Sequence, residues 1–556
     1  MIQKNYIKIY ESAFKELWSL PALTNYSCGT TYSYAEVAKW VAKVHLQLKA
    51  LGVEPQEKVA LIAKDSAEWC MTFMGVITYG AVVVPILPDF HVDDIHNIIN
   101  HSDATVVYSG DKHIEELEAS KLPKVRAVVN LQGLKISVAH TPAIAENTPT
   151  ANWLFEQRYP EGFTQKDIVY PNISNEEVMV INYTSGTMGF SKGVILTANN
   201  LAGNVLFADA QQKMLKSRRM LCFLPLAHAY SCAFNFLTPL QSGTHVFILG
   251  ALPTPSLLLK AFADVKPHII ITVPLILEKM YKNVILPAIQ KAGIRIALRT
   301  PIISGVIGKK IRQQMVQAMG GKCLEIIVGG APMSEEVSTF LSKIKFPYTV
   351  GYGMTECAPL ISYVGSEHYK AHSCGKPLEG YMEVRIDDSI EGLPAGTGEI
   401  QVRGENTCKG YFKNPEATQQ LFTSDGWMRT GDIGLMDAEG YLFIKGRSKT
   451  MLLGPSGQNI YPEELEARLN LMPCIAESLV IQNKKGALVA LVYPDAVAVK
   501  AKGLSPQELL ETMERNRAEL NTQVASYEKI AKIIIRDEDF QRTPKNSIKR
   551  YLYQEA

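Results

Sequence analysis

The chain alternates short β-branched runs with longer stretches whose apolar residues recur at helical spacing. Residues 32–52 show the helical pattern and end in Gly52, a residue that favours helix C-termini. Six runs have the composition of buried strands: 58–63, 81–86, 104–110, 245–249, 268–273 and 323–330. Alternation of this kind predicts an α/β fold in which helices cover parallel sheets.

From about residue 376 the pattern changes. "MEVRI", "GEIQVRG" and "GYLFIKGR" are typical of short antiparallel strands joined by Gly and Asp turns, and "ESLVIQNKKGALVALVYP" predicts a further strand pair in a mixed α/β C-terminal part. The 556 residues are too many for one compact core. We therefore expect two domains, residues 1–447 and 448–556.

Residues 69–88 carry no charge and approach the length that spans a bilayer. Two glycines and two prolines interrupt them, and 81–86 has the composition of a buried parallel strand after a short helix. We favour that second interpretation over a membrane span. The N-terminal "MIQKNYIKIYESAF" lacks the apolar core of a signal peptide. The expectation is a cytoplasmic protein with at most peripheral membrane contact.

Charge and cysteine content exclude some classes of function. A net charge of +2 argues against nucleic acid as the main partner, because neutralising phosphates needs a basic surface. Nine cysteines without a CxxC pair fit free thiols in a reducing compartment better than a disulfide framework.

The segment 183–193, "YTSGTMGFSKG", follows an apolar run that predicts a buried strand. Its glycines let backbone N–H groups approach an anion, its hydroxyls add donors, and Lys192 adds a positive charge. This composition suits the phosphates of a nucleotide, although the common pattern GxxxxGK[ST] is absent. For an isolated segment, a mobile surface loop is the simpler explanation.

Further motifs follow in order: "LPLAHAY" (224–230), "VGGAPMS" (328–334), "GYGMTECAPL" (351–360), "GWMRTGDIG" (426–434), "GYLFIKGRSKTMLLGPSGQNIYPEELE" (440–466) and "RTPKNSIKR" (542–550). With the glycine-rich segment they resemble the core motifs of the adenylate-forming superfamily, which includes acyl-CoA synthetases, firefly luciferase and the adenylation domains of peptide synthetases. The resemblance covers nearly the whole chain. It implies a small β-barrel-like subdomain in the large domain and a mobile C-terminal α+β lid that hinges at Lys449.

The resemblance also implies a reaction. Mg-ATP converts a carboxylic acid to acyl-AMP and pyrophosphate, and a thiol, usually coenzyme A, then attacks the acyl carbon. Charge develops on phosphate and carbonyl oxygens, so fixed donors and a metal should stabilise it. The expected phosphate-binding residues are Thr184, Ser185, Gly186, Thr187 and Lys192. Met188 and Ser191 depart from the family pattern and remove one hydroxyl and one proline.

By the same resemblance, "GYGMTE" is the adenine and α-phosphate element. Tyr352, followed by Gly353, would stack on adenine, and Thr355 would hydrogen-bond the α-phosphate. Glu356 would ligate Mg²⁺ as a hard oxygen donor, with Thr184 as a second candidate ligand. Out of this context, an ordinary turn with a helix cap would explain the motif equally well.

Other nucleotide contacts come from later motifs. Asp432 would accept both ribose hydroxyls, and Arg447 would be the second ribose contact. The small-residue wall beside adenine would be Gly329, Gly330 and Ala331. Gly457 lies in a loop that would face the site during thioester formation.

His228 would lie where the carboxylate meets the acyl pocket, although a lone His in an apolar run is more often a core residue. Residues 268–289 resemble fatty acyl-CoA synthetases more than amino-acid-activating domains. The neighbouring apolar side chains that would suit an alkyl chain are Ala229, Cys232, Phe234 and Phe236.

The lid of this family normally delivers a lysine from a "GK" pair, but this chain has Asn546-Ser547 there. If residues 545–549 are extended, Lys545 and Lys549 share a face with Ser547. We favour Lys545 as the substitute, with Lys549 second; the alternative is that both are solvated.

Three functions remain open. The first is a medium- or long-chain fatty acid–CoA ligase using ATP, Mg²⁺ and coenzyme A. The second is a ligase for another carboxylate or for an acyl carrier protein. The third is a non-catalytic nucleotide- or acyl-binding relative that lacks the usual lid lysine. It is disfavoured by the presence of Lys192, Glu356, Asp432 and Arg447. The sequence leaves chain length, acceptor and oligomeric state undetermined.

Overall fold

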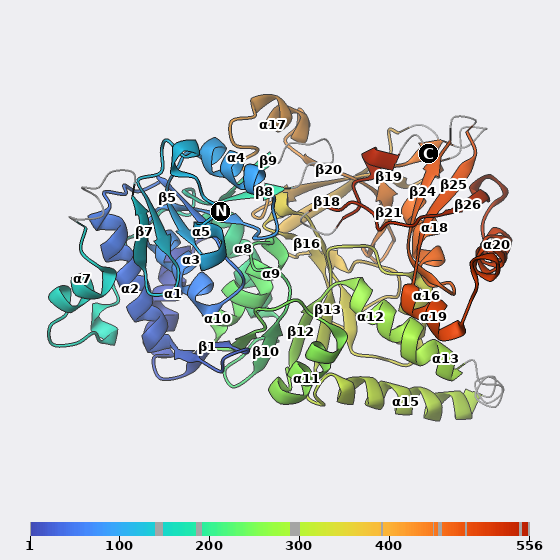
Figure 1. Ribbon diagram of the computed structural model, residues 1–556, viewed down its shortest axis with the longest axis horizontal. Coiled ribbons are helices and arrows are strands. Elements are labelled where there is room, and N and C mark those ends of the chain that lie inside the picture. Colours follow the sequence, from blue (N-terminus) through green and yellow to red (C-terminus); the bar gives the residue numbers. More distant parts are fainter. Residues whose placement is uncertain are drawn as a thin grey trace.

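Two seven-stranded sheets form the centre of the larger, N-terminal domain in the computed structural model, which describes residues 2–139, 148–184, 192–289, 301–390, 393–448, 450–453, 459–483, 486–543 and 547–553 (Figure 1). The first sheet has the order β14-β13-β12-β10-β11-β1-β2. Its strands are β1 (Pro21–Asn25), β2 (Thr31–Ser33), β10 (Arg219–Cys222), β11 (His245–Ile248), β12 (Ile269–Thr272), β13 (Glu325–Val328) and β14 (Tyr348–Val350).

The second sheet has the order β7-β6-β5-β3-β4-β8-β9. Its strands are β3 (Lys58–Ile62), β4 (Val82–Ile86), β5 (Ala104–Ser109), β6 (Ala127–Asn130), β7 (Lys135–Ala139), β8 (Val178–Thr184) and β9 (Lys192–Thr197). In both sheets the neighbouring strands are parallel except for the edge pairs β1–β2, β6–β7 and β8–β9. The predicted parallel-rich sheets and all six predicted strand runs are confirmed.

Helix α3 (Ala67–Tyr79) lies between the two sheets, since it contacts β1 of the first and both β3 and β4 of the second. Residues from Ala67 to Thr78, except Glu68, are buried on every side of this helix, which explains why the run 69–88 carries no charge. The prediction of a short helix followed by a buried strand is confirmed. Among the described residues, no helix is both long and apolar enough to cross a membrane.

Further helices cover the sheets. The predicted helix at 32–52 is α2 (Tyr34–Ala50), which begins at a Ser33–Glu36 capping box and is followed by Gly52 in the left-handed conformation, with φ of 66°. Others in this domain are α1 (Tyr6–Glu16), α4 (Val92–Ser102), α5 (Asp111–Ile114), α7 (Ala151–Arg158), α8 (Ala198–Ala210), α9 (Ala229–Ser231), α10 (Thr238–Ser242), α11 (Pro255–Val265), α12 (Pro274–Met280), α13 (Leu286–Ile289), α15 (Pro301–Ala318), α16 (Glu335–Lys343) and α17 (Pro415–Leu421).

The change of pattern near residue 376 marks an antiparallel region. Strands β18 (Met382–Asp387), β19 (Thr397–Gly404), β20 (Met428–Met436) and β21 (Leu442–Arg447) form a four-stranded sheet in sequence order. The three-stranded sheet of β15 (Tyr352–Gly353), β16 (Leu360–Tyr363) and β17 (Lys376–Pro377) lies beside it, with β17 contacting β18. These sheets correspond to the expected barrel-like subdomain.

The smaller C-terminal domain is α+β, as expected. It consists of β22 (Leu452–Leu453), β23 (Asn459–Ile460), α18 (Pro462–Leu469), β24 (Ile475–Gln482), β25 (Leu488–Pro494), α19 (Ala496–Lys502), α20 (Pro506–Gln523) and β26 (Ile530–Ile535). Buried Leu465, Leu469, Leu520 and Ile530 belong to a core of its own. The predicted strand pair is the antiparallel β24–β25.

A lysine of the large domain ties the two domains together. The Lys282 ammonium donates to the carbonyls of Asn470 and Ile475, both at 2.6 Å. Asn470 is the C-cap of α18, where a positive charge interacts favourably with the helix dipole. Burial lowers the pKa of Lys282 to about 8.

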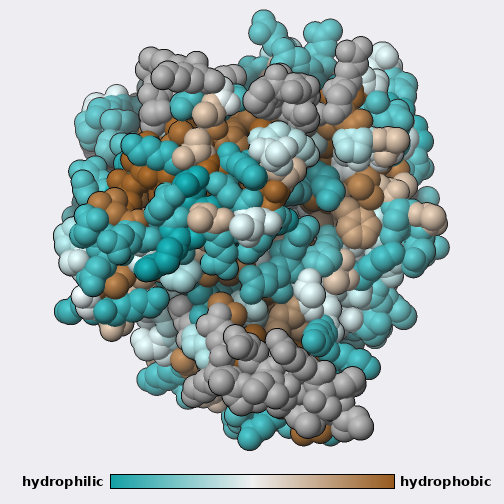
Figure 2. Space-filling view, turned by 90° about the vertical axis from the view of Figure 1, so that its right-hand side faces the viewer, coloured by the Kyte–Doolittle hydropathy of each residue, from teal (hydrophilic) through white to brown (hydrophobic). Residues whose placement is uncertain are grey.

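Next to this contact, a cleft of about 1010 Å³ lies between the domains, lined by residues of both, among them Met333, Lys445, Arg468 and Lys502. Seen from the C-terminal side, the surface is mainly hydrophilic with scattered apolar areas (Figure 2). Single exposed apolar side chains such as Val497 and Leu510 are ordinary on a protein surface.

Candidate active site

Asp432 is held between two residues that the sequence analysis assigned to the same nucleotide. The Tyr352 hydroxyl donates to Asp432 Oδ2 at 2.6 Å, and Arg447 Nε donates to Oδ1 at 3.0 Å. Asp432 and Arg447 are cross-strand partners of β20 and β21, which explains their pairing. Each carboxylate oxygen keeps a second lone pair that can accept from a ligand hydroxyl.

The electrostatics of this group reflect its burial. Burial raises the pKa of Asp432, although Arg447 and Tyr352 act in the opposite direction. The pKa of Arg447 is raised, mainly by the Asp432 charge, while 63% of its side chain stays exposed. The Glu356 carboxylate contributes to raising both pKa values, so it lies close enough to interact with both groups.

Glu356 and Lys192 are connected by a residue that the sequence analysis did not select. The Tyr411 hydroxyl donates to Glu356 Oε1 at 2.8 Å, and the Lys192 ammonium lies 4.8 Å from the centre of the Tyr411 ring. Glu356 is only 8% exposed. A tyrosine between a buried carboxylate and a lysine fixes both with respect to each other.

The donors around Glu356 fit a magnesium ion that arrives with phosphates. Within the described ranges, Glu356 Oε2 makes no hydrogen bond or ion pair, so one hard oxygen remains for a cation. The same residues contain no group of three or more His, Cys, Asp or Glu side chains that could hold a metal ion. Mg²⁺ is commonly bound by one or two carboxylates together with substrate phosphates and water, and a single carboxylate therefore fits this ion.

The glycine-rich segment connects the antiparallel strands β8 and β9. Thr184 and Lys192 are register partners at its base, and Thr184 Oγ1 donates to the Lys192 carbonyl at 3.4 Å. The expected phosphate-binding residues Ser185, Gly186 and Thr187 lie outside the described residues. The described base of the segment therefore places Lys192 beside Tyr411, which in turn binds Glu356.

The expected adenine wall lies at the end of β13. A Cβ on Gly329 would lie 3.0 Å from Tyr230 Cζ, and the Tyr230 hydroxyl donates to the Ile327 carbonyl at 3.0 Å. Gly330 and Ala331 follow as exposed residues. His228 precedes Tyr230 by two residues, at the N-cap of α9.

The adjoining "GYGMTE" turn depends on Gly353, where a Cβ would lie 2.1 Å from the Pro359 carbonyl oxygen. Thr355 begins the short helix η5 (Thr355–Cys357), which also carries Glu356.

Tyr230 also lines a cavity of about 30 Å³, which holds about one water-sized group. Its apolar lining comprises Phe207, Ala208, Met214, Tyr230, Phe234, Ile327, Leu360 and Tyr363. The apolar residues that were expected around an alkyl chain therefore do not all lie in one place. Phe234 lines this cavity, whereas fully buried Phe236 packs on Trp69 and Phe73 in the core.

The expected lid residues are only partly described. Lys449, Gly457 and Lys545 lie outside the described residues. Thr543 N–H donates to the Ser547 carbonyl and Lys549 N–H to that of Gln541, so residues 541–543 and 547–549 pair in antiparallel fashion. Among the described residues, no hydrogen bond or ion pair joins the Lys549 side chain to the Asp432 group.

All nine cysteines are described, and each is a free thiol. This is the state that the sequence favoured over a disulfide framework.

Comparisons with known proteins cover nearly the whole chain. The family described as AMP-binding enzyme matches residues 13–412, and the family described as AMP-binding enzyme C-terminal domain matches 450–556. A long-chain-fatty-acid–CoA ligase FadD15 of Mycobacterium bovis is 28% identical over 499 residues, covering 84% of this chain and 78% of the relative. A 4-coumarate-CoA ligase 1 of Narcissus pseudonarcissus is 27% identical over 529 residues, covering 92% and 86%.

Solved structures share the fold. ATP-bound MatB from Rhodopseudomonas palustris superposes with a TM-score of 0.75 at 22% identity, covering 99% of this chain and 98% of MatB. The anthranilate CoA ligase AuaEII in complex with anthranoyl-AMP gives 0.76 at 21% identity, covering 99% and 96%. At these identities the likeness concerns the fold alone.

Proposed function

Because this chain belongs to the AMP-binding enzyme family, we propose that it activates a carboxylic acid with ATP to acyl-AMP and then transfers the acyl group to coenzyme A. The observation that carries this proposal is the buried contact of Asp432 with Tyr352 and Arg447 beside Glu356. Acyl-AMP formation from Mg-ATP needs a ribose acceptor, an aromatic platform and a carboxylate for a metal in one place, and this group offers all three.

Each residue has a role in this proposal. Asp432 and Arg447 hold the ribose, Tyr352 stacks on adenine against Gly329, Gly330 and Ala331, and Thr355 hydrogen-bonds the α-phosphate. The β- and γ-phosphates bind Lys192 with Thr184, Ser185, Gly186 and Thr187. Glu356, with Thr184 as a further candidate, holds Mg²⁺, which neutralises charge on the phosphates. His228 meets the substrate carboxylate.

We further propose that the acid is a medium- or long-chain fatty acid. The FadD15 relative and the apolar cavity beside Tyr230 support this choice. The cavity is smaller than an alkyl chain, so Tyr230 or Phe234 must rotate when the chain enters. Each methylene that is then buried contributes about 0.8 kcal/mol. The 4-coumarate relative supports the second candidate, an aromatic acid.

The domain proposal divides the chain into residues 1–447 and 448–556, with a hinge at Lys449 that lets the small domain rotate between half-reactions. The interdomain cleft admits the pantetheine arm of coenzyme A, and a carrier protein is the alternative donor of that arm. The loop at Gly457 would face the site during thioester formation. Lys545, or else Lys549, replaces the usual lid lysine. A cytoplasmic location is part of the same proposal.

Product analysis tests the function. The purified chain is incubated with ATP, Mg²⁺, coenzyme A and single acids from hexanoate to stearate, plus 4-coumarate and anthranilate. We expect equal amounts of AMP and acyl-CoA, with a rate that rises with chain length up to a maximum. A preference for an aromatic acid rejects the fatty acid, and release of no AMP with any acid rejects the ligase.

A further inference from the structure

A bulge in β20 sets the position of Asp432. Glu399 of β19 pairs with Ile433, and Gln401 pairs with Arg429, so the single residue between them on β19 faces three residues of β20. Thr430, Gly431 and Asp432 therefore leave the ladder with β19, and Gly431 takes the left-handed conformation with φ of 71°. Bulges of this kind re-aim side chains beside active sites.

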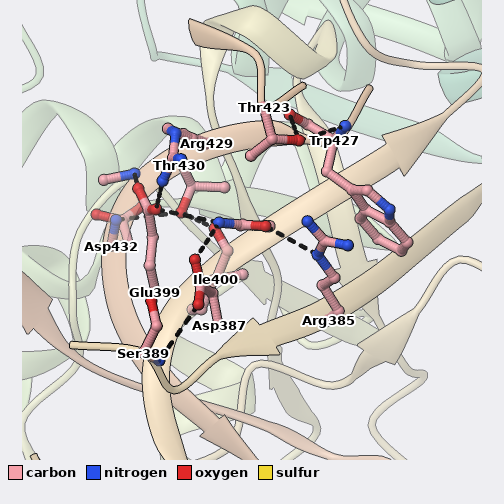
Figure 3. Close-up of polar contacts among 12 residues, drawn as sticks. Arg385, Asp387, Ser389, Glu399, Ile400, Thr423, Trp427, Arg429, Thr430 and Asp432 are labelled. Atoms are coloured by element: carbon pink, nitrogen blue, oxygen red, sulfur yellow. Dashed lines mark hydrogen bonds and ion pairs between the residues drawn. The ribbon is translucent and has the colours of Figure 1, made fainter. Parts of the chain in front are cut away.

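The carboxylate of Glu399 accepts from one backbone N–H of the bulge and from two neighbouring side chains. Its Oε1 accepts from Gly431 N–H at 3.2 Å, and its Oε2 accepts from Arg429 at 2.8 Å and from Gln401 at 3.3 Å. Glu399 is only 9% exposed. Figure 3 shows its side chain extending from β19 toward the bulge, next to Arg429, Thr430 and Asp432.

Thr430 completes the support of the bulge. Its hydroxyl donates to the Ile400 carbonyl at 2.6 Å and accepts from Asp432 N–H at 3.1 Å. Side chains thus accept from two backbone N–H groups of the bulge: Glu399 accepts from Gly431 N–H, and Thr430 accepts from Asp432 N–H. A buried N–H without an acceptor is costly, so loss of Glu399 favours a rearranged bulge.

We infer that Glu399 is a positioning residue that orients the Asp432 carboxylate toward the ribose through Gly431. The inference rests on the proposed function, in which Asp432 accepts the ribose hydroxyls. Asp432 itself is fixed on its other side by Arg447 and Tyr352. Glu399 therefore affects the angle of the Asp432 carboxylate. This angle decides how strongly the site distinguishes a nucleotide with both ribose hydroxyls from one that lacks a hydroxyl.

Ribose discrimination measures this role. Acyl-AMP formation is compared between ATP and 3′-deoxyATP, as the ratio of the two kcat/KM values, in the wild type, Glu399→Ala and Glu399→Gln. We expect Glu399→Ala to lower that ratio about tenfold, as when a hydrogen bond to a charged group is misaligned. Glu399→Gln keeps an acceptor for Gly431 and should recover part of the ratio. A merely structural loss lowers both kcat/KM values equally and leaves the ratio unchanged.

Two variants complete the design. Glu383→Ala removes an exposed glutamate of the adjacent strand β18, paired with Arg403 at 2.6 Å, and should keep the wild-type ratio. Asp432→Ala gives the ratio that remains without the ribose acceptor. When Glu399→Ala is combined with Asp432→Ala, the ratio should change little further. If Glu399→Ala does not fold, Glu399→Gln must still lower the ratio.

The outcomes separate the two levels of the argument. A wild-type ratio in Glu399→Ala, together with a lowered ratio in Asp432→Ala, overturns the role of Glu399 and keeps the proposed function. A wild type that forms acyl-AMP equally well from both nucleotides overturns the ribose role of Asp432 and the role of Glu399 with it. A wild type that forms no acyl-AMP contradicts the proposed function; the ratio of AMP to 3′-deoxyAMP affinities then tests Glu399 separately.

Discussion

The Tyr411 hydroxyl donates to Glu356 Oε1 at 2.8 Å while the Lys192 ammonium lies 4.8 Å from the centre of the same ring. One tyrosine thus joins the base of the glycine-rich segment to the carboxylate that we assign to Mg²⁺. In the proposed function Glu356 Oε2, the oxygen that does not accept from Tyr411, is the ligand for the cation. On that proposal Tyr411 is a positioning residue for the metal ligand.

Tyr411→Phe removes this hydrogen bond and keeps the ring beneath Lys192. We expect acyl-AMP formation to fall by about tenfold or more, because a hydrogen bond to a charged group contributes about 1.5–3 kcal/mol. The Mg²⁺ concentration for half-maximal rate should rise, because Glu356 loses its fixed orientation. Tyr79→Phe is the matched control, since the Tyr79 hydroxyl bonds the Val53 carbonyl far from the site motifs. An unchanged Mg²⁺ dependence in Tyr411→Phe would contradict its role.

Lys282→Met removes the ammonium that binds the Asn470 and Ile475 carbonyls and keeps the apolar part of the side chain. The two lost bonds stabilise the present orientation of the small domain, so the ratio of the two half-reaction rates should change by about tenfold. Rates of acyl-AMP formation and of thioester formation from supplied acyl-AMP provide the measurement. Lys279→Met, an exposed lysine of α12, is the control. Equal ratios in wild type and Lys282→Met would contradict a role of Lys282 in fixing the orientation of the small domain.

Stability of the small domain should depend on pH through Glu466. Burial raises the pKa of Glu466 from 4.5 to about 7, although Arg550 opposes the shift. Between these values the folded state keeps a proton that the unfolded state releases, so the free energy of unfolding falls as pH rises from about 4.5 to about 7. The fall is on the order of 3 kcal/mol, and it is complete above this window.

Glu466→Gln has no such proton and should lack this part of the pH dependence. Its amide oxygen can still accept from Val480 N–H, which Glu466 Oε1 binds at 2.7 Å. Hydrogen exchange in the small-domain core, measured across the window, gives the difference between the two proteins. The exposed Glu511→Gln is the control. If the free energy of unfolding changes with pH in the same way in wild type and Glu466→Gln, Glu466 is not the source of this pH dependence.

The substitute for the lid lysine gives a selective prediction. Lys545→Ala should slow acyl-AMP formation and leave thioester formation from supplied acyl-AMP unchanged, because we propose that this lysine meets the carboxylate and α-phosphate oxygens in the first step alone. Lys549→Ala should have the smaller effect, and Ser547→Lys should restore the first step in Lys545→Ala. If both alanine variants form acyl-AMP at the parent rate, neither lysine replaces the usual lid lysine.

The sequence allowed much of this architecture to be predicted, because its signals are local. Uncharged β-branched runs such as 81–86 mark parallel strands, and the uncharged run 69–78 is typical of a helix that is buried on every side. Asp432, Arg447 and Tyr352 were predicted as one group from a resemblance, and their contact is observed.

The remaining features depend on contacts between distant segments. Tyr411 lies in a loop with no periodic pattern, although its position in "KGYFKN" was a usable signal. Glu399 was assigned only to a strand, because the register shift opposite it leaves no mark in the sequence of β19. Lys282 looked like an ordinary helix lysine, since its carbonyl partners lie about 190 residues further along the chain.

Acid-dependent exchange of pyrophosphate into ATP, measured without coenzyme A, tests the central claim most directly, because it reports acyl-AMP formation alone. A saturated fatty acid should support exchange in the wild type and in Glu383→Ala. Asp432→Ala should lose at least tenfold, because it lacks the ribose acceptor, and Glu356→Gln should bind ATP but support little exchange. Full exchange in both site variants, or none in the wild type with any carboxylic acid, would contradict the account.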